Sequence, residues 1–506
     1  MTARTSLRSL TLAGLSAALA VNPLLTSVTG PQTASSATRK TTRAKSSTTV
    51  KPTVPTTVKG RVSTPNILFV LADDMGVDAS PCYRAFGIAK PKMPNVEQLC
   101  HDGVVFDNMT ASPVCSPSRA AALTGRYGFR TNVGNVDDEL SADETSIHDV
   151  VAAAPVPYAN ALIGKWHLGG AQPDPTQPQR LGVEYFDGFL RAQVQDYSNW
   201  PRVTQGQAST STVYTTTAFT DSAIAWTSKQ TKPWFLWLAY NAPHTPFHSP
   251  PAALVSDSTL SGAADDVAQN PQKYYFAALE ALDKELGRLL ASMPASTREN
   301  TVVMFMGDNG TPSRVAQEPF SIDNSKGIVS EGGVHVPLIV AGAGVTQRST
   351  RNASLLNGVD VFPTIAELAH GKVTSPIDGV SFASTLHAEG ASSARTFAYS
   401  ELFTGTVRAP AATPTRSTLP GVRPRPGGGN GAGGVALPGG GASTAGVNVW
   451  AVRDERYKLV HDVATGDEQV FDLQTDPSES RGAAPTGAME AVASRLRNIV
   501  AKLRSQ

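Results

Sequence analysis

The sequence predicts an α/β fold: a large, mostly parallel sheet sandwiched by helices, followed by a smaller C-terminal domain of antiparallel strands and a helix. Two observations support this prediction. Short apolar runs bounded by turn-forming residues recur along the chain and are typical of buried strands. The segments between them have helical periodicity, and strands that alternate with helices form parallel sheets covered on both faces.

Each element follows from its own pattern. Tyr274–Leu290 has apolar residues at spacings of three and four, which predicts an amphipathic helix. Near the C-terminus, alternating residues in VNVWAVRDERYKLVHD and EQVFDLQTDP predict antiparallel strands, and Ala488–Leu503 predicts a final helix. The buried strands are predicted at Asn66–Ala72, Ala159–Ile163, Trp234–Tyr240 and Thr301–Met306.

Composition divides the rest of the chain. Residues 1–30 place Arg4 and Arg8 ahead of an apolar run and small residues, the layout of a secretory signal peptide, so we expect a secreted or periplasmic protein. Residues 31–63, rich in Ser and Thr, predict a linker. We expect a catalytic domain over 64–395 and a C-terminal subdomain over 396–506, with a Gly/Pro-rich insert around 404–446 that is too poor in apolar residues to fold alone.

Charge, hydropathy and cysteine content exclude some partners. The 43 basic and 42 acidic residues nearly balance, which argues against nucleic acid as a partner. Pro23 interrupts the first apolar run, and no later segment approaches the roughly 20 apolar residues that a stable membrane span requires. In an oxidising compartment Cys82 and Cys100 could pair and leave Cys115 unpaired; the alternative is two buried free thiols.

Polar clusters follow the predicted strands, where ligands of parallel sheets bind. Asp73 and Asp74 follow the first strand, and Asp308 and Asn309 follow the last. Adjacent carboxylates repel each other unless they share a proton or a cation. Oxygen ligands of this kind suit Ca²⁺ or Mg²⁺.

The stretch PVCSPSRAAALTGR adds a cysteine to the candidate residues. Pro117 suits the first turn of a helix, so Cys115 would stand at a solvent-facing helix start, where backbone donors favour an anion. Arg119, four residues on, would point from the same face. The structural alternative is a buried cysteine beside an arginine that pairs elsewhere.

Two lysines and two histidines complete the candidates. Each lies in a turn punctuated by Gly or Pro, although such residues are often only solvated. Together with a cation they would form a strongly electropositive pocket, suited to a small oxyanion ester. They are Lys165, His167, His244 and Lys326.

These motifs resemble those of the type I sulfatases, the formylglycine-dependent arylsulfatase family of the alkaline phosphatase superfamily. CSPSRAAALTG resembles the signature that directs oxidation of its cysteine to formylglycine. NILFVLADDMG, GKWHLGG, APHTPFH, GDNG and SKGIVSEGGVHVPLIV follow in the family's order. The resemblance implies a sulfuric ester hydrolase that cleaves an aryl or carbohydrate sulfate, and a formylglycine-generating enzyme as a partner during maturation.

The resemblance also implies roles for the candidates. One hydroxyl of hydrated formylglycine at Cys115 would attack sulfur, and the other would expel sulfate. Arg119 and Lys165 would orient this residue, and His167 would take its proton. His244 and Lys326 would hold sulfate oxygens, and one of them would protonate the leaving oxygen. The ligands implied for Ca²⁺, or Mg²⁺ in its place, are Asp73, Asp74, Asp308, Asn309 and modified Cys115.

Two alternatives stay open at this point. A phosphonate monoester or phosphodiester hydrolase would share the signature, the metal and the fold. A non-catalytic extracellular binding protein would keep the fold with an unmodified cysteine. One position departs from the family's pattern: Gly307 precedes Asp308 where Ser or Thr is commoner, so we expect no supporting side-chain hydrogen bond from that position.

Overall fold

The computed structural model describes residues 64–404 and 448–506. The predicted signal peptide, the linker and the Gly/Pro-rich insert from residue 405 onward lie outside the described residues. In the described part of the chain, no helix has both the length and the apolarity that crossing a bilayer would require.

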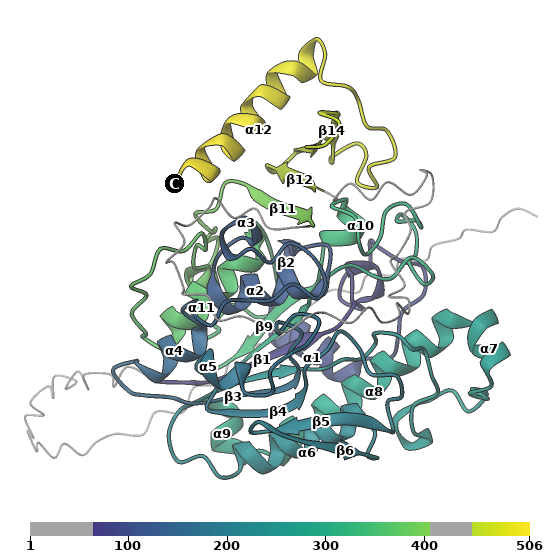
Figure 1. Cartoon of the computed structure of the whole chain (residues 1–506), viewed down its shortest axis with the longest axis vertical. Coiled ribbons are helices and arrows are strands. Elements are labelled where there is room, and N and C mark those ends of the chain that lie inside the picture. The colour runs from purple at the N-terminus through teal and green to yellow at the C-terminus, as the bar shows by residue number, and fades with distance from the viewer. Residues whose placement is uncertain (1–63, 405–447) are drawn as a thin grey trace, which may run out of the picture. The chain divides into compact units, whose positions relative to one another are not determined.

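A large mixed sheet forms the centre of the fold (Figure 1). Its strand order is β10-β2-β9-β8-β1-β7-β3-β4-β5-β6. The pairs β8/β1, β1/β7, β7/β3 and β3/β4 are parallel, whereas β9 and the β5–β6 end of the sheet are antiparallel to their neighbours. The strands are β1 (Asn66–Ala72), β2 (Gly103–Thr110), β3 (Ala159–Lys165), β4 (Tyr185–Phe189), β5 (Trp200–Thr204), β6 (Gln207–Ser211), β7 (Trp234–Ala239), β8 (Thr301–Gly307), β9 (Leu338–Gly342) and β10 (Thr350–Asn357).

Helices cover both faces of this sheet. The α-helices before the C-terminal sheet are α1 (Pro94–Asp102), α2 (Cys115–Thr124), α3 (Gly128–Thr131), α4 (Ile147–Ala152), α5 (Gln177–Arg180), α6 (Thr215–Thr227), α7 (Ala264–Gln269), α8 (Pro271–Ser292), α9 (Ala295–Glu299), α10 (Glu331–Val334) and α11 (Val361–Leu368). Short 3-10 helices lie at η1 (Val77–Ala79), η2 (Ala252–Leu254), η3 (Gly358–Asp360) and η4 (Ala383–Leu386).

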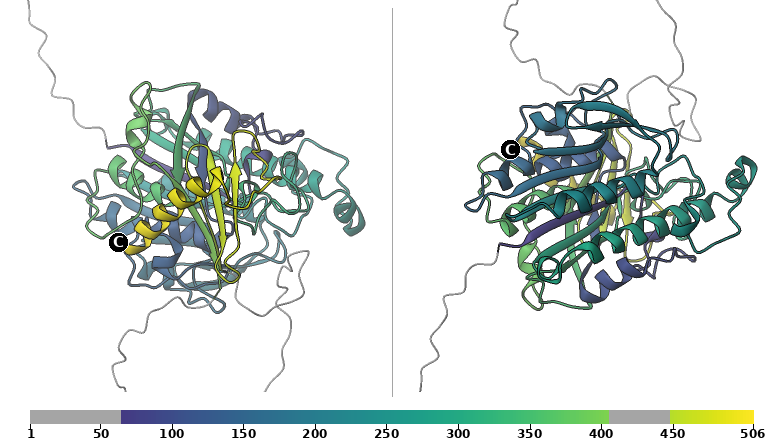
Figure 2. Two further views of the ribbon diagram at one scale, coloured as in Figure 1. Left: turned by 90° about the horizontal axis from the view of Figure 1, so that it is seen from above. Right: turned by 90° about the horizontal axis from the view of Figure 1, so that it is seen from below.

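The strand β1 shows why the sheet is buried on both sides. Ile67 and Phe69 pack into one core with residues of α2, α4 and α11, while Leu68 and Val70 pack into a second core with residues of α1, α6 and α8. Figure 2 shows α6 and α8 running side by side across that second face. A strand with apolar contacts on both faces needs a continuous apolar run, and NILFVLA supplies one.

The C-terminal part is a four-stranded antiparallel sheet with a helix against it. Its strands, in spatial order, are β11 (Ala398–Phe403), β12 (Asn448–Arg453), β13 (Tyr457–Asp462) and β14 (Glu468–Asp472). Helix α12 (Ala488–Ser505) packs on them through Ala493, Leu496 and Val500. The fold class predicted from the sequence is thus confirmed.

Most predicted elements lie where the patterns put them. The run at Asn66–Ala72 is strand β1 to the residue, and the predicted strand at Ala159–Ile163 continues through Lys165. The predicted helix Tyr274–Leu290 is the central part of α8. VNVWAVRDERYKLVHD contains two strands, β12 and β13, joined by a turn.

Candidate active site

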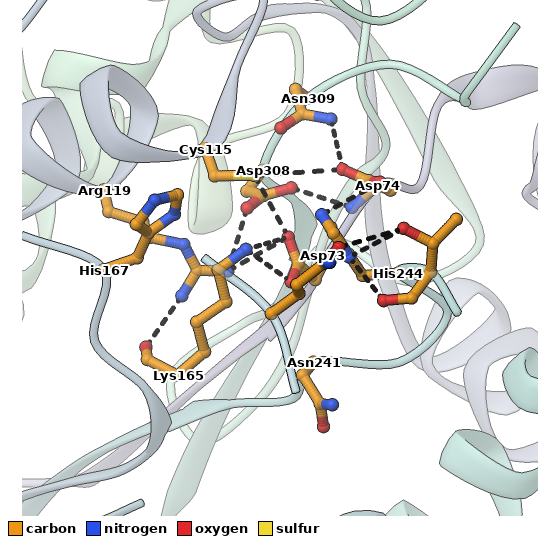
Figure 3. A network of polar contacts seen from close by, with 12 residues as sticks. Asp73, Asp74, Cys115, Arg119, Lys165, His167, Asn241, His244, Asp308 and Asn309 are labelled. Carbon is orange, nitrogen blue, oxygen red and sulfur yellow. Dashed lines mark hydrogen bonds and ion pairs between the residues drawn. The ribbon is translucent and has the colours of Figure 1, made fainter. Parts of the chain in front are cut away.

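Neighbouring parallel strands bring the two acidic pairs together. Asp73 and Asp74 follow β1 and Asp308 follows β8, and these strands pair in parallel with Ala72 opposite Gly307. The Asp74 amide donates to Asp308 Oδ1 at 2.9 Å, and Asn309 Nδ2 donates to Asp74 Oδ1 at 2.9 Å. Residues more than 230 positions apart in the chain therefore meet at one edge of the sheet (Figure 3).

The backbone at Asp74 is held in an unusual conformation. Its φ of 73° lies in the left-handed region, which disfavours residues other than glycine. The hydroxyl of Tyr275, on α8, donates to the Asp74 carbonyl oxygen at 2.7 Å and helps to hold this turn. Strained backbone of this kind is common at functional sites, where the surroundings enforce it.

Steric crowding explains why position 307, directly before Asp308, is a glycine in this chain. A Cβ atom at Gly307 would lie 2.0 Å from the carbonyl oxygen of Met75, which is backbone and cannot move aside cheaply. No side chain fits at position 307, so none supports Asp308 from there. Asp308 is supported instead by Arg119, whose Nη2 donates to Asp308 Oδ2 at 2.8 Å.

Cys115 is the first residue of α2 and faces the carboxylates. Its Sγ lies 3.3 Å from Asp73 Oδ1, 3.9 Å from Asp74 Oδ1 and 3.7 Å from Lys326 Nζ. The expectation of a solvent-facing helix start is wrong, because Cys115 is only 1% exposed. Burial raises the pKa of its thiol well above the ordinary value, and the charges of Lys165 and Lys326 do not offset this effect.

Arg119 and Lys165 are buried cations beside Cys115. Lys165 Nζ donates to Asp73 Oδ2 at 2.7 Å, and Arg119 Nη1 donates to the Lys165 carbonyl oxygen at 2.8 Å. Gly164 allows β3 to place Lys165 here, because a Cβ at Gly164 would lie 1.9 Å from the carbonyl oxygen of Ala239 on β7. Burial alone would raise the pKa of Asp73, but the charge of Lys165 and the other nearby cations hold that pKa well below its usual value.

His167 is held by a carboxylate that the sequence analysis did not single out. Its Nε2 lies 3.1 Å from Asp137 Oδ1, and its Nδ1 is buried without a hydrogen-bond partner among the described residues. Burial lowers the pKa of His167 to about 3, so the ring is neutral near neutral pH. The only sequence signal for Asp137 is an acidic pair in a polar loop, NVDDEL, and this pattern occurs in many turns.

His244 and Lys326 complete the cluster on its less buried side. His244 Nε2 lies 3.7 Å from Asp74 Oδ2, and Lys326 Nζ lies 2.5 Å from Asp74 Oδ1. Burial lowers the pKa of His244, partly offset by Asp74. Burial would also lower the pKa of Lys326, but Asp74 and its neighbours raise it, so the ammonium stays charged.

The carboxylate and amide oxygens of the cluster fit a hard divalent cation. One oxygen or nitrogen of Asp73, Asp74 and His244 lies with Cys115 Sγ in a group whose atoms are all within 4.8 Å of one another. Asn309 Oδ1 is buried with no hydrogen-bond partner among the described residues, as expected of an oxygen reserved for another ligand. Burial and the charge of Asp73 raise the pKa of Asp308 to about 7, and a cation would hold it ionised.

The side-chain charges of the cluster sum to zero, and a divalent cation together with two negative charges would keep that sum at zero. Three carboxylates, of Asp73, Asp74 and Asp308, meet three cationic side chains. Adding a divalent cation makes the cluster doubly positive. A singly charged ester and an ionised nucleophile would then restore neutrality, which favours binding and reaction in a buried site. The three cationic side chains are Arg119, Lys165 and Lys326.

Comparison with known proteins assigns the family. Residues 65–372 match the sequence profile of the family described as Sulfatase. The chain therefore belongs to the sulfatase family, which confirms the resemblance found in its motifs.

Relatives and solved structures agree with this assignment. Arylsulfatase J of Mus musculus is 26% identical over 339 residues, covering 62% of this chain and 54% of that protein. The ulvan-active sulfatase of Formosa agariphila is 27% identical over 336 residues, covering 62% of this chain and 63% of that protein. The chain thus spans between half and two thirds of these relatives. The crystal structure of Ps i-CgsB in complex with k-i-k-neocarrahexaose has the same fold, with a TM-score of 0.63, 22% identity and coverage of 87% of this chain and 92% of that chain.

Proposed function

We propose that this protein hydrolyses a sulfate monoester of a saccharide or aryl alcohol and releases inorganic sulfate. The observation that carries the proposal is the position of Cys115, at the start of α2 with its Sγ among two carboxylates and the Lys326 ammonium. Family membership supports the reaction class. The names of relatives that act on ulvan or bind a neocarrahexaose favour a carbohydrate sulfate over a simple aryl sulfate.

Cys115 would act after oxidation to formylglycine. A thiol with a raised pKa, packed against carboxylates, is a poor nucleophile and a poor ligand for a hard cation. The hydrate of the aldehyde would supply one hydroxyl to attack sulfur and a second whose ionisation expels sulfate. Because Arg119 and Lys165 are fixed by buried hydrogen bonds, they would orient this residue without reorganising during the reaction.

Four carboxylate or amide side chains would hold a divalent cation, Ca²⁺ by the family resemblance with Mg²⁺ as the alternative. The cation would supply a positive charge for a sulfate oxygen and favour the ionised nucleophile. The orphaned Asn309 Oδ1 supports this assignment. The residues that would hold it are Asp73, Asp74, Asp308 and Asn309, with modified Cys115 beside them.

The remaining side chains divide proton transfer and anion binding between them. His167 is neutral and has a free Nδ1, so it would accept the proton of the second hydroxyl, while Asp137 accepts a hydrogen bond from Nε2 and fixes the tautomer. Lys326 and His244 face the less buried side, where sulfate oxygens and the leaving oxygen would lie. One of these two would protonate the leaving oxygen.

Export is part of the proposal. The structure joins Cys82 and Cys100 by a disulfide, which is stable in an oxidising compartment. This agrees with the predicted signal peptide and favours a secreted or periplasmic enzyme, with maturation by a formylglycine-generating enzyme.

The test compares ester classes directly. Purified protein from a host that makes formylglycine should hydrolyse 4-nitrophenyl sulfate and lose this activity in Cys115→Ala. A matched aryl phosphonate and an aryl phosphodiester are the competing substrates. Faster turnover of either one than of the sulfate would replace the proposal with the phosphonate or phosphodiester hydrolase, and activity retained by Cys115→Ala would refute the assigned nucleophile.

A further inference from the structure

The side chains of the cluster around Cys115 differ in how far they are exposed to solvent. The side chains of Asp73 and Lys165 are 0% exposed and that of Arg119 is 1% exposed, whereas His244 is 10% and Lys326 is 19% exposed. An ester that brings its sulfate group to Cys115 must therefore extend its alcohol portion past His244 and Lys326.

A cavity of about 640 Å³ is lined by residues that directly follow His244 in the chain. Thr245 lines it, and the Thr245 carbonyl oxygen lies 2.8 Å from His244 Nδ1. Small-molecule sites occupy roughly 300–1,000 Å³, so the cavity has the size of a ligand pocket. Its walls come from the segment after His244, from α7 and from the loop after β8: Thr245, Pro246, Phe247, His248, Ser249, Gly262, Ala264, Val267, Ala268 and Arg314.

One wall of the cavity is connected through Tyr275 to the turn at Asp74, one of the residues proposed to hold the cation. The ring of Phe247 packs edge-on against Tyr275, with centroids 6.0 Å apart, and the Tyr275 hydroxyl donates to the Asp74 carbonyl oxygen. His248 has both ring nitrogens in hydrogen bonds, to the Tyr214 hydroxyl and to a backbone carbonyl, each at 2.9 Å. His248 thus serves as a rigid neutral wall, because burial lowers its pKa to about 4.

The other wall carries a cation. Arg314 lies five residues after Asn309 on the segment between β8 and α10. The same segment carries Lys326, whose amide donates to the Thr311 carbonyl oxygen at 3.0 Å. Arg314 is exposed and donates from Nη2 to the Ala268 carbonyl oxygen at 3.3 Å. Within residues 64–404 and 448–506 it forms no ion pair with a carboxylate, and no acidic residue lines the cavity.

We propose that this cavity binds a neighbouring sugar unit of the substrate and that Arg314 recognises a second anionic group on it, a sulfate or a carboxylate. The inference rests on the proposed function and specifies its substrate as a multiply charged oligosaccharide. An aromatic ring, two hydroxyl side chains and one unpaired guanidinium match an anionic sugar, which presents an apolar ring face, hydroxyls and a planar or tetrahedral oxyanion. Arg314 does not contact the cluster around Cys115, so its guanidinium would contribute to substrate binding and not to the chemical step.

The test separates this subsite from the reaction. Calorimetry would measure the binding of defined sulfated glycosaminoglycan and galactan fragments, two to six sugars long, to calcium-loaded Cys115→Ala protein that cannot turn them over. Each fragment is paired with a counterpart that lacks one anionic group away from the scissile ester. We expect at least one multiply charged fragment to bind about five- to tenfold more tightly than its counterpart, because one charge-assisted contact at an exposed arginine is involved.

Substitution at Arg314 then identifies the residue responsible. Arg314→Gln should remove the preference for the second charge, and Arg314→Lys should retain part of it. Arg298→Gln is the matched control. Arg298 is also an exposed arginine, but it lies on α9 and does not line the cavity. Hydrolysis of 4-nitrophenyl sulfate, which lacks a second charge, should be unchanged in Arg314→Gln.

Each outcome decides one question. If wild-type protein hydrolyses 4-nitrophenyl sulfate but no fragment shows a preference for the second charge, the subsite is refuted while the proposed function stands. A preference that survives in Arg314→Gln also refutes it. Absence of sulfate hydrolysis by formylglycine-bearing wild-type protein is a failure of the proposed function itself.

Discussion

Asp137 offers the sharpest prediction about the proposed mechanism. Its carboxylate lies 3.1 Å from His167 Nε2 and leaves Nδ1 as the free nitrogen. Asp137→Ala removes this acceptor, so the proton on the imidazole can move to Nδ1 and the ring can turn. Asp137→Glu keeps a carboxylate that can accept the same hydrogen bond. We expect a large loss of turnover in the first variant and a small one in the second.

The magnitude follows from one hydrogen bond. A hydrogen bond to a charged group contributes about 1.5–3 kcal/mol when buried. The Asp137 side chain is 50% exposed, so solvent screening reduces this to about 1–2 kcal/mol. Because about 1.4 kcal/mol corresponds to tenfold in rate, Asp137→Ala should lower kcat about five- to thirtyfold. Asp137→Glu should lower it about threefold or less, since a carboxylate acceptor remains.

The assay is steady-state hydrolysis of 4-nitrophenyl sulfate across a range of pH. We expect kcat to fall and KM to stay nearly constant, because Asp137 contacts His167 and is not among the side chains proposed to hold the sulfate. Asp137 raises the pKa of His167, so removing its charge lowers that pKa further and moves any acidic limb controlled by His167 to lower pH. Glu139→Gln, an exposed acid two positions away, is the control. Equal losses in Asp137→Ala and Asp137→Glu, or an unmoved pH profile with lowered thermal stability, would refute a positioning role.

Three further predictions address the metal, the anion and the C-terminal sheet. Asp308→Ala should abolish bound metal, measured by elemental mass spectrometry, and unchanged metal content would show that the ligand set is wrong. Lys326→Ala should lower kcat by about 10²–10³-fold with a smaller change in KM, as for other groups that stabilise developing charge; a change confined to KM would contradict this. Burial raises the pKa of Glu401 on β11 to about 7 in the folded protein, from a usual value near 4.5 in the unfolded chain. The folded state therefore loses stability as pH rises from about 4.5, and the loss is complete above about pH 7. Relative to wild type, Glu401→Gln should therefore gain up to roughly 3 kcal/mol of unfolding free energy between pH 4.5 and 8 in denaturation curves, and a pH-independent difference would contradict the shift.

Much of the site could be predicted because it is built from strand ends. Asp73 follows a run of seven buried residues, and Asp308 follows another such run, so apolar patterning alone predicts both positions. Parallel strands end at the same edge of a sheet, which accounts for the meeting of these acids with Lys165 at the end of β3. The start of α2 at Cys115 follows from Pro117 in its first turn.

Other features depend on packing that local patterns do not encode. Asp137 lies in a polar loop without periodicity, and both it and its partner His167 adopt left-handed backbone conformations, with φ of 59° and 56°, that no local pattern predicts. Cys115 is buried against side chains that are distant in the sequence, Asp73, Asp74 and Lys326, so the helix signal alone predicted its exposure wrongly. The contact of Tyr275 with Asp74 joins residues 201 positions apart and has no sequence signal beyond an aromatic on the buried face of α8.

The central claim is that Cys115 is converted to formylglycine, and the mass of the tryptic peptide that contains it tests this claim most directly. The protein should come from its native host or from one with a formylglycine-generating enzyme. We predict a peptide lighter than the thiol form by the difference between CH₂SH and an aldehyde, or the mass of the corresponding hydrate. A peptide that carries only the unmodified thiol, from protein that nevertheless hydrolyses sulfate esters, would contradict the proposed nucleophile.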